Sequence, residues 1–93
     1  MNIEYLIKLW KKSNYNKIMI KDLPLARDSD SVVVEPTLII NKNEKISFGK
    51  EMNAYEYLEK MFKNCIFEYI KDEEMLIAKV IYKKNVFIKE ENK

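Results

Sequence analysis

The side chains that most often carry catalysis are scarce in this chain of 93 residues. It has no histidine, which is the commonest general base near neutral pH and the commonest metal ligand. Its single cysteine, Cys65, opens an apolar stretch, which indicates an inert buried thiol and excludes both an intramolecular disulfide and a zinc site. One glycine cannot form a glycine-rich phosphate loop. We therefore expect no enzymatic activity, no cofactor and no bound metal.

Carboxylates gather between residues 22 and 36, where the only cation is Arg27. Carboxylate oxygens suit Mg²⁺ or Ca²⁺, but this stretch lacks the glycine and the terminal glutamate of a calcium-binding loop. A solvated acidic loop is the better interpretation. Such a loop can occupy a basic groove in place of phosphates, so we expect it to contact a partner protein. The expected partner-binding residues are Asp22, Asp28, Asp30 and Glu35.

Basic and aromatic side chains alternate near the N-terminus, as they do in proteins that stack bases and contact phosphates. The candidate nucleic-acid-binding residues are Tyr5, Lys8, Lys11, Lys12, Tyr15 and Lys17. Trp10 lies among them but falls on an apolar stripe, which favours a place in the core. The lysines also fit a solvated helix face, and a formal charge of +2 gives no strong field for nucleic acid. Direct nucleic-acid binding is therefore the alternative hypothesis.

Hydrophobic periodicity predicts the elements that carry these residues. Apolar side chains recur with a 3.6-residue period over residues 3–12, after the capping residue Asn2, which predicts a helix. Residues 17–21 alternate, which predicts a strand with one solvated face. Residues 24–31 have the composition of a loop. We expect a strand over 31–40 that Pro36 confines to a sheet edge, to a bulge or to two shorter strands.

The second half of the chain is predicted to contain one helix between two hairpins. A turn over 41–44 returns the chain to a strand over 45–48, so a hairpin with the preceding strand is expected. Gly49 then separates that strand from a helix that Asn53 and Glu56 cap and that ends at Asn64.

A charged turn separates two strand-like arms between Cys65 and Tyr82, and this hairpin is expected to lie centrally in the sheet. Glu68 is expected opposite or diagonal to Lys79, on the wetter face. The segment 86–88 is expected to form a further short strand or to continue the preceding one. Residues 89–93 are expected to fray as a charged tail.

Together these elements predict an α+β domain with two layers, a predominantly antiparallel sheet of five or six strands with two helices packed on one face. The expected order is α-β-β-β-α-β-β, with residues 1–93 as a single domain. No apolar run is long enough to span a bilayer and no signal-like segment opens the chain, so we expect a cytoplasmic protein.

The leading functional hypothesis is a small interaction protein that binds a larger protein partner and inhibits or modulates it. Tyrosine and methionine, which are favoured at protein interfaces, are abundant. In size, strand content and lack of catalytic groups the chain resembles the small inhibitors encoded by phages and mobile elements, including those aimed at CRISPR effectors. That resemblance implies a nucleic-acid machine as the partner. An oligomeric accessory subunit, for example a homodimer formed through the Pro36 strand, is a further alternative.

Overall fold

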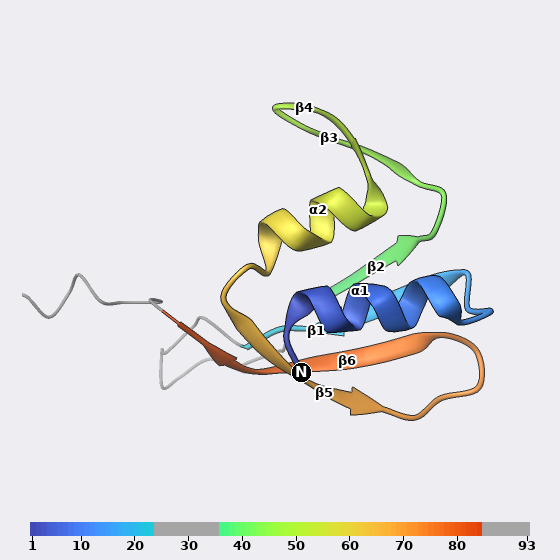
Figure 1. The fold of residues 1–93 in the computed structure, drawn as a ribbon, viewed down its shortest axis with the longest axis vertical. Helices are drawn as coiled ribbons and strands as arrows, with labels where there is room; N and C mark the ends of the chain where they lie inside the picture. Colours follow the sequence, from blue (N-terminus) through green and yellow to red (C-terminus); the bar gives the residue numbers. More distant parts are fainter. Residues whose placement is uncertain (24–35, 85–93) are drawn as a thin grey trace, which may run out of the picture.

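The computed structural model of the protein describes residues 1–23 and 36–84. Within them the chain forms two helices and six strands, drawn in Figure 1. In chain order these are α1 (Ile3–Lys12), β1 (Lys17–Lys21), β2 (Thr37–Asn41), β3 (Lys45–Phe48), β4 (Lys50–Asn53), α2 (Ala54–Met61), β5 (Cys65–Ile70) and β6 (Leu76–Lys83). The expected α+β class is confirmed.

Several expected features lie outside the described residues. They are the loop over 24–31, the part of the 31–40 strand before Pro36, the short strand over 86–88 and the tail 89–93.

Helix α1 forms as its sequence predicts. The side-chain Oδ1 of Asn2 accepts a hydrogen bond from the backbone N–H of Tyr5 at 2.9 Å, which satisfies one of the four free donors at the helix start. Lys11 and Lys12 lie in the last turn, where their charges oppose the negative end of the helix dipole. The apolar stripe of α1 is buried and consists of Ile3, Leu6, Ile7 and Trp10.

Four strands form the main sheet, in the order β2-β1-β6-β5. The pairs β1–β2 and β5–β6 are antiparallel, while β1 and β6 pair in parallel, so the sheet is mixed. The parallel pair joins strands that are far apart in the sequence, and no local pattern could indicate it. β2 lies at one edge and begins directly after Pro36, in agreement with the edge position that proline permits.

The expected hairpin between the Pro36 strand and the strand over 45–48 is wrong. β2 pairs with β1, and β3 pairs with β4 as a separate two-stranded sheet. Gly49 makes this possible because its backbone has a φ of +80°, which lets Phe48 and Lys50 face each other across a tight turn. No sequence pattern indicates β4, since Lys50–Asn53 lacks the β-branched and aromatic residues that favour strands.

Helix α2 begins at the expected capping box. The side chain of Asn53 accepts from the backbone N–H of Glu56 at 2.8 Å, and the Glu56 carboxylate accepts from the backbone N–H of Asn53 at 3.2 Å. The helix ends at Met61, not at Asn64 as expected. Phe62 leaves the helix to pack edge-on against Phe67, with ring centroids 5.8 Å apart, so burial of this ring ends the helix early.

The core lies between the helices and one face of the main sheet, called here the inner face. Helix α1 lies over this face, and α2 packs beside α1 (Figure 1). Leu58 of α2 belongs to the same buried cluster. The β3–β4 hairpin projects from α2, away from the main sheet (Figure 1). On the strands, the inner positions are occupied by Ile18, Ile20, Ile40, Phe67, Leu76, Ala78 and Val80.

The hairpin between Cys65 and Tyr82 is confirmed as β5 and β6, with Glu68 directly opposite Lys79. Only β6 is central, however, because β5 lies at the sheet edge. The N-terminus covers part of that edge: the Met1 ammonium group donates to the carbonyl of Phe67 at 2.9 Å, and the Phe67 N–H donates to the carbonyl of Met1 at 2.7 Å.

Candidate interaction surface

The opposite face of the main sheet, called here the outer face, carries an apolar row across all four strands. Strand register places Met19 opposite both Ile39 and Ile77, and Ile77 opposite Ile70. Residues in register point to the same side of a sheet, so these four side chains form one continuous line. We call Met19, Ile39, Ile70 and Ile77 the outer row.

The outer row meets solvent within the part of the chain that the structure describes. Ile39 is 48% exposed, and the other three side chains are half-buried. The row exists because β1, β2, β5 and β6 carry apolar residues at outward as well as inward positions, whereas only the inward ones lie under α1. An antiparallel sheet with one wet face usually alternates apolar and polar residues, and this sheet departs from that pattern.

Polar side chains border the outer row. Lys17 and Lys21 lie two residues to either side of Met19 on β1, and Lys21 faces Lys79 on β6. Lys79 in turn faces Glu68 on β5. The outer face therefore combines an apolar centre with a border that carries more lysine than glutamate.

A second apolar pair lies farther along the same side of β5 and β6. Ile66 and Tyr82 are register partners, and both are exposed. A β-bulge lies between this pair and the next one, in which Phe67 faces Val80. Ile66 and Tyr82 are separated from the outer row by the Glu68 and Lys79 pair. This arrangement lengthens the exposed apolar surface of the outer face.

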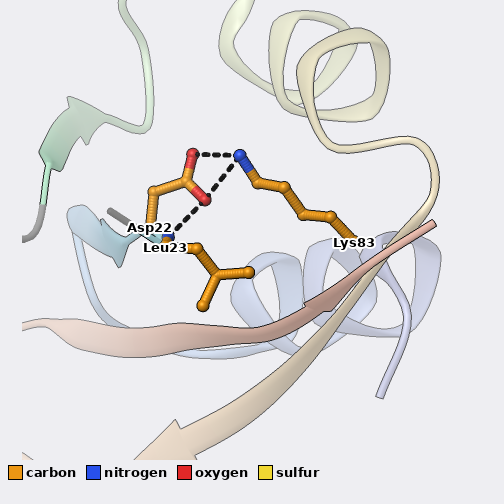
Figure 2. Close-up of polar contacts among 3 residues, drawn as sticks. All are labelled: Asp22, Leu23 and Lys83. Atoms are coloured by element: carbon orange, nitrogen blue, oxygen red, sulfur yellow. Dashed lines mark hydrogen bonds and ion pairs between the residues drawn. The ribbon is translucent and has the colours of Figure 1, made fainter. Parts of the chain in front are cut away.

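An ion pair fixes one end of the sheet, shown in Figure 2. The ammonium nitrogen of Lys83 lies 2.9 Å from Asp22 Oδ1 and 3.0 Å from Asp22 Oδ2. The same carboxylate accepts from the backbone N–H of Leu23 at 2.7 Å, and the backbone N–H of Asp22 donates to the carbonyl of Pro36 at 2.8 Å. These contacts join the ends of β1, β2 and β6.

Of the four predicted acidic binding residues, only Asp22 lies within the described residues. Its carboxylate contacts the Lys83 ammonium group and the Leu23 backbone N–H. The other three, Asp28, Asp30 and Glu35, lie outside the described residues. Binding of a partner by this acidic segment stays a prediction.

The candidate nucleic-acid residues are spread over different surfaces. Tyr5 is 56% exposed on α1, which lies on the inner side of the sheet, whereas Lys17 borders the outer row. Lys8, Lys11 and Lys12 are exposed on α1, and the Lys11 ammonium group lies 4.8 Å from the centre of the Tyr55 ring. The structure does not bring these side chains together into one groove.

Tyr15, the remaining candidate for base stacking, is half-buried. Its hydroxyl donates to the carbonyl of Asp72 at 2.6 Å, and its own carbonyl accepts from the indole N–H of Trp10 at 3.1 Å. Desolvation raises the pKa of Tyr15 above 10.0, and Tyr69, Asp72 and Glu73 raise it further. These contacts join the end of α1 to the turn between β5 and β6.

Cys65 is buried at the start of β5, as the sequence indicated. Desolvation raises the pKa of its thiol above 9.0; the charge of Lys83 acts in the opposite direction and that of Asp22 raises it. A thiol with a raised pKa is a poor nucleophile near neutral pH.

One shallow hollow of about 170 Å³ has a largely apolar lining and opens between β2 and α2. Leu38, Tyr57 and Met61 contribute to it, and the Tyr57 ring also packs edge-on against Phe48 at 5.9 Å between centroids. Ligand pockets are usually about 300 Å³ or larger, so the hollow is small for an organic ligand.

Within residues 1–23 and 36–84, no group of three or more acidic or cysteine side chains could hold a metal ion. No helix in the same residues is long and apolar enough to cross a membrane. No protein-family model, curated protein or solved structure matches the chain.

The outer row could not be predicted from the sequence, although part of its signal is present there. Alternation along a strand places Ile70 on the same face as Glu68 and Ile77 on the same face as Lys79. It likewise places Met19 on the lysine-bearing, solvated face of its strand. Their alignment depends on the parallel pairing of β1 with β6, which no local pattern indicates.

Proposed function

We propose that this protein is a non-enzymatic interaction protein that binds a larger protein partner through the outer face and thereby inhibits or modulates that partner. The observation that supports this proposal is the outer row, an unbroken apolar line over four strands that meets solvent within the described residues. Contiguous exposed apolar surface with a polar border is typical of protein interaction sites.

The chemistry of the chain favours binding over catalysis. The sequence contains no histidine, and its one thiol has a raised pKa. A protein of this kind acts on a partner by occupying a surface or by stabilising one conformation of it. Inhibition or modulation of the partner is the outcome that we propose for such binding.

The acidic segment adds a second contact to the proposal. Asp28, Asp30 and Glu35 carry three negative charges in a stretch with one cation, Arg27. Such a segment complements a lysine- or arginine-lined groove, as found on proteins that handle nucleic acid. A nucleic-acid machine is therefore the partner class that this segment favours.

Affinity capture with matched variants tests the proposal. The binding variant is Met19→Gln/Ile39→Gln, which places neutral polar groups in the outer row. The control is Tyr5→Gln on α1, where the side chain is 56% exposed, against 48% for Ile39. We expect wild type and the control to retain the same partner from a lysate of the source cells, and the double variant to retain about tenfold less. Circular dichroism checks that all three proteins fold.

Equal retention of the partner by all three folded proteins would place the interface elsewhere. Loss of binding in Tyr5→Gln alone would favour the surface of α1, where the candidate nucleic-acid residues Lys8, Lys11 and Lys12 lie.

A further inference from the structure

The dimensions of the outer face limit what can cover it. β1 and β2, with five residues each, are about 17 Å long, and β6, with eight residues, is about 27 Å long. Four strands spaced by about 4.8 Å span about 19 Å or less. The face therefore offers roughly 300–500 Å², below the roughly 800 Å² that each partner contributes to a standard stable interface. An α-helix, with a diameter of about 10 Å including side chains, fits on a face of this size.

The charge of the border favours an acidic occupant. Lys17 and Lys21 flank Met19, and neither forms an ion pair or side-chain hydrogen bond with another residue in the described ranges 1–23 and 36–84. Glu73 and Glu74 lie across a hollow from Lys17 without closing an ion pair. Carboxylates on an occupant could approach both lysines while an apolar stripe covers the outer row.

The same charges disfavour a second copy of this chain. Two copies packed outer face to outer face would bring both pairs of Lys17 and Lys21 to one interface of small area. Like charges at such an interface oppose association, and the area is too small to offset them.

From the area and the charge of this face, we propose that the outer face binds an amphipathic α-helix of the partner, one whose apolar stripe is bordered by aspartate or glutamate. The inference rests on the proposed function and names the partner element that the outer row receives. Bound in this way, the helix would cover the outer row as α1 covers the inner face, which gives a three-layer arrangement at the interface.

Two synthetic helical peptides test the inference. Both carry the same stripe of leucine and isoleucine, bordered by glutamate in one peptide and by lysine in the other. Their affinities for the full-length protein are measured by fluorescence anisotropy at low and at high ionic strength. We expect the glutamate-bordered peptide to bind roughly fivefold to tenfold more tightly at low ionic strength, with the preference reduced by salt.

Two variants assign the effect to named residues. Lys17→Glu/Lys21→Glu should reverse the preference between the peptides, since it exchanges the border charges and leaves the outer row intact. Met19→Gln/Ile39→Gln should weaken both peptides by about tenfold, because both use the apolar centre.

Three results would overturn the inference. Equal binding of both peptides, unaffected by salt, would show that Lys17 and Lys21 do not discriminate between acidic and basic helices. Binding of neither peptide, while the captured partner still depends on the outer row, would refute a helical occupant and leave the proposed function standing. Concentration-dependent dimerisation that Met19→Gln/Ile39→Gln abolishes would identify a second copy of this chain as the occupant. It would refute both the helical occupant and the proposed function.

Discussion

Ile39 and Ile40 are neighbours on β2, yet they have opposite environments. Ile40 points to the inner face and is 2% exposed, whereas Ile39 points to the outer face and is 48% exposed. The two residues share a side-chain type, a strand and an edge position. Their difference therefore comes from what covers each face, with α1 and α2 on one side and no described helix on the other.

This comparison shows that apolar composition alone does not define a core. The strands of the main sheet carry apolar residues on both sides, but the described helices cover only one of them. Inner-face residues contribute to folding, and we assign the outer row to binding. Substitutions on the two faces should therefore separate stability from partner affinity.

The largest expected difference comes from the same change at both neighbours. Ile40→Ala removes a buried side chain and should lower the free energy of unfolding by about 2–5 kcal/mol. Ile39→Ala changes a half-exposed side chain at a sheet edge and should cost about 1 kcal/mol or less. Chemical denaturation of both variants measures the two values. Equal losses would show that the outer row belongs to the folding core of the free protein.

The ion pair at the end of the sheet should have an intermediate effect. Asp22→Asn removes the charge that holds Lys83, whose side chain is about one-fifth exposed, and should cost about 1–2 kcal/mol. Lys84→Met, at the neighbouring exposed lysine, serves as the control and should change stability by about 0.5 kcal/mol or less. Thermal unfolding compares the two. An Asp22→Asn variant as stable as its control would contradict a stabilising role for this ion pair.

A smaller effect concerns pH. The pKa of Cys65 is higher in the folded protein than its ordinary value of 9.0, because burial disfavours the thiolate. The corresponding stability is fully present below pH 9 and is lost as the pH rises from 9 towards the folded pKa, since the unfolded chain releases its proton first. Cys65→Val should reduce this loss.

Denaturation at a series of pH values measures the dependence on Cys65. Alkylation of the native thiol should also be slower than that of the unfolded chain. Identical pH curves for wild type and Cys65→Val, together with rapid native alkylation, would contradict a buried, neutral thiol.

The smallest stability change is expected in the acidic segment. Asp28→Lys/Asp30→Lys should alter stability by about 0.5 kcal/mol or less for each substitution, because the sequence predicts a solvated loop here and changes in such a loop seldom do more. Association with a partner that is basic at this contact should slow, through lost steering and new repulsion. Stopped-flow or surface plasmon resonance kinetics measure the rate. Unchanged association would leave the outer face as the whole interface, and a large fall in melting temperature would show that the segment is structural.

Much of the local structure followed from the sequence. The period of α1, the Asn53 and Glu56 capping box and the opposition of Glu68 to Lys79 depend on neighbouring residues, so periodicity and turn chemistry predict them. The length of α2 could not be predicted, since Phe62 leaves the helix for a contact with Phe67, a residue on another element.

The long-range pairing could not be predicted for a related reason. The separate β3–β4 hairpin depends on the positive φ of Gly49, and the parallel β1–β6 pair depends on how the chain crosses over the sheet. The candidate site could not be predicted for the same reason. Met19, Ile39 and Ile77 come from three strands, so their alignment is known only once the strand order is known.

Photo-crosslinking from the outer row tests the central claim most directly. A benzophenone amino acid is placed at position 39 in one protein and at position 5 in another, both exposed, and each is irradiated with the captured partner. The outer-face assignment predicts a crosslink from position 39 that maps to an apolar, acid-bordered helix of the partner, and little or none from position 5. A crosslink from position 5 with none from position 39 would contradict it.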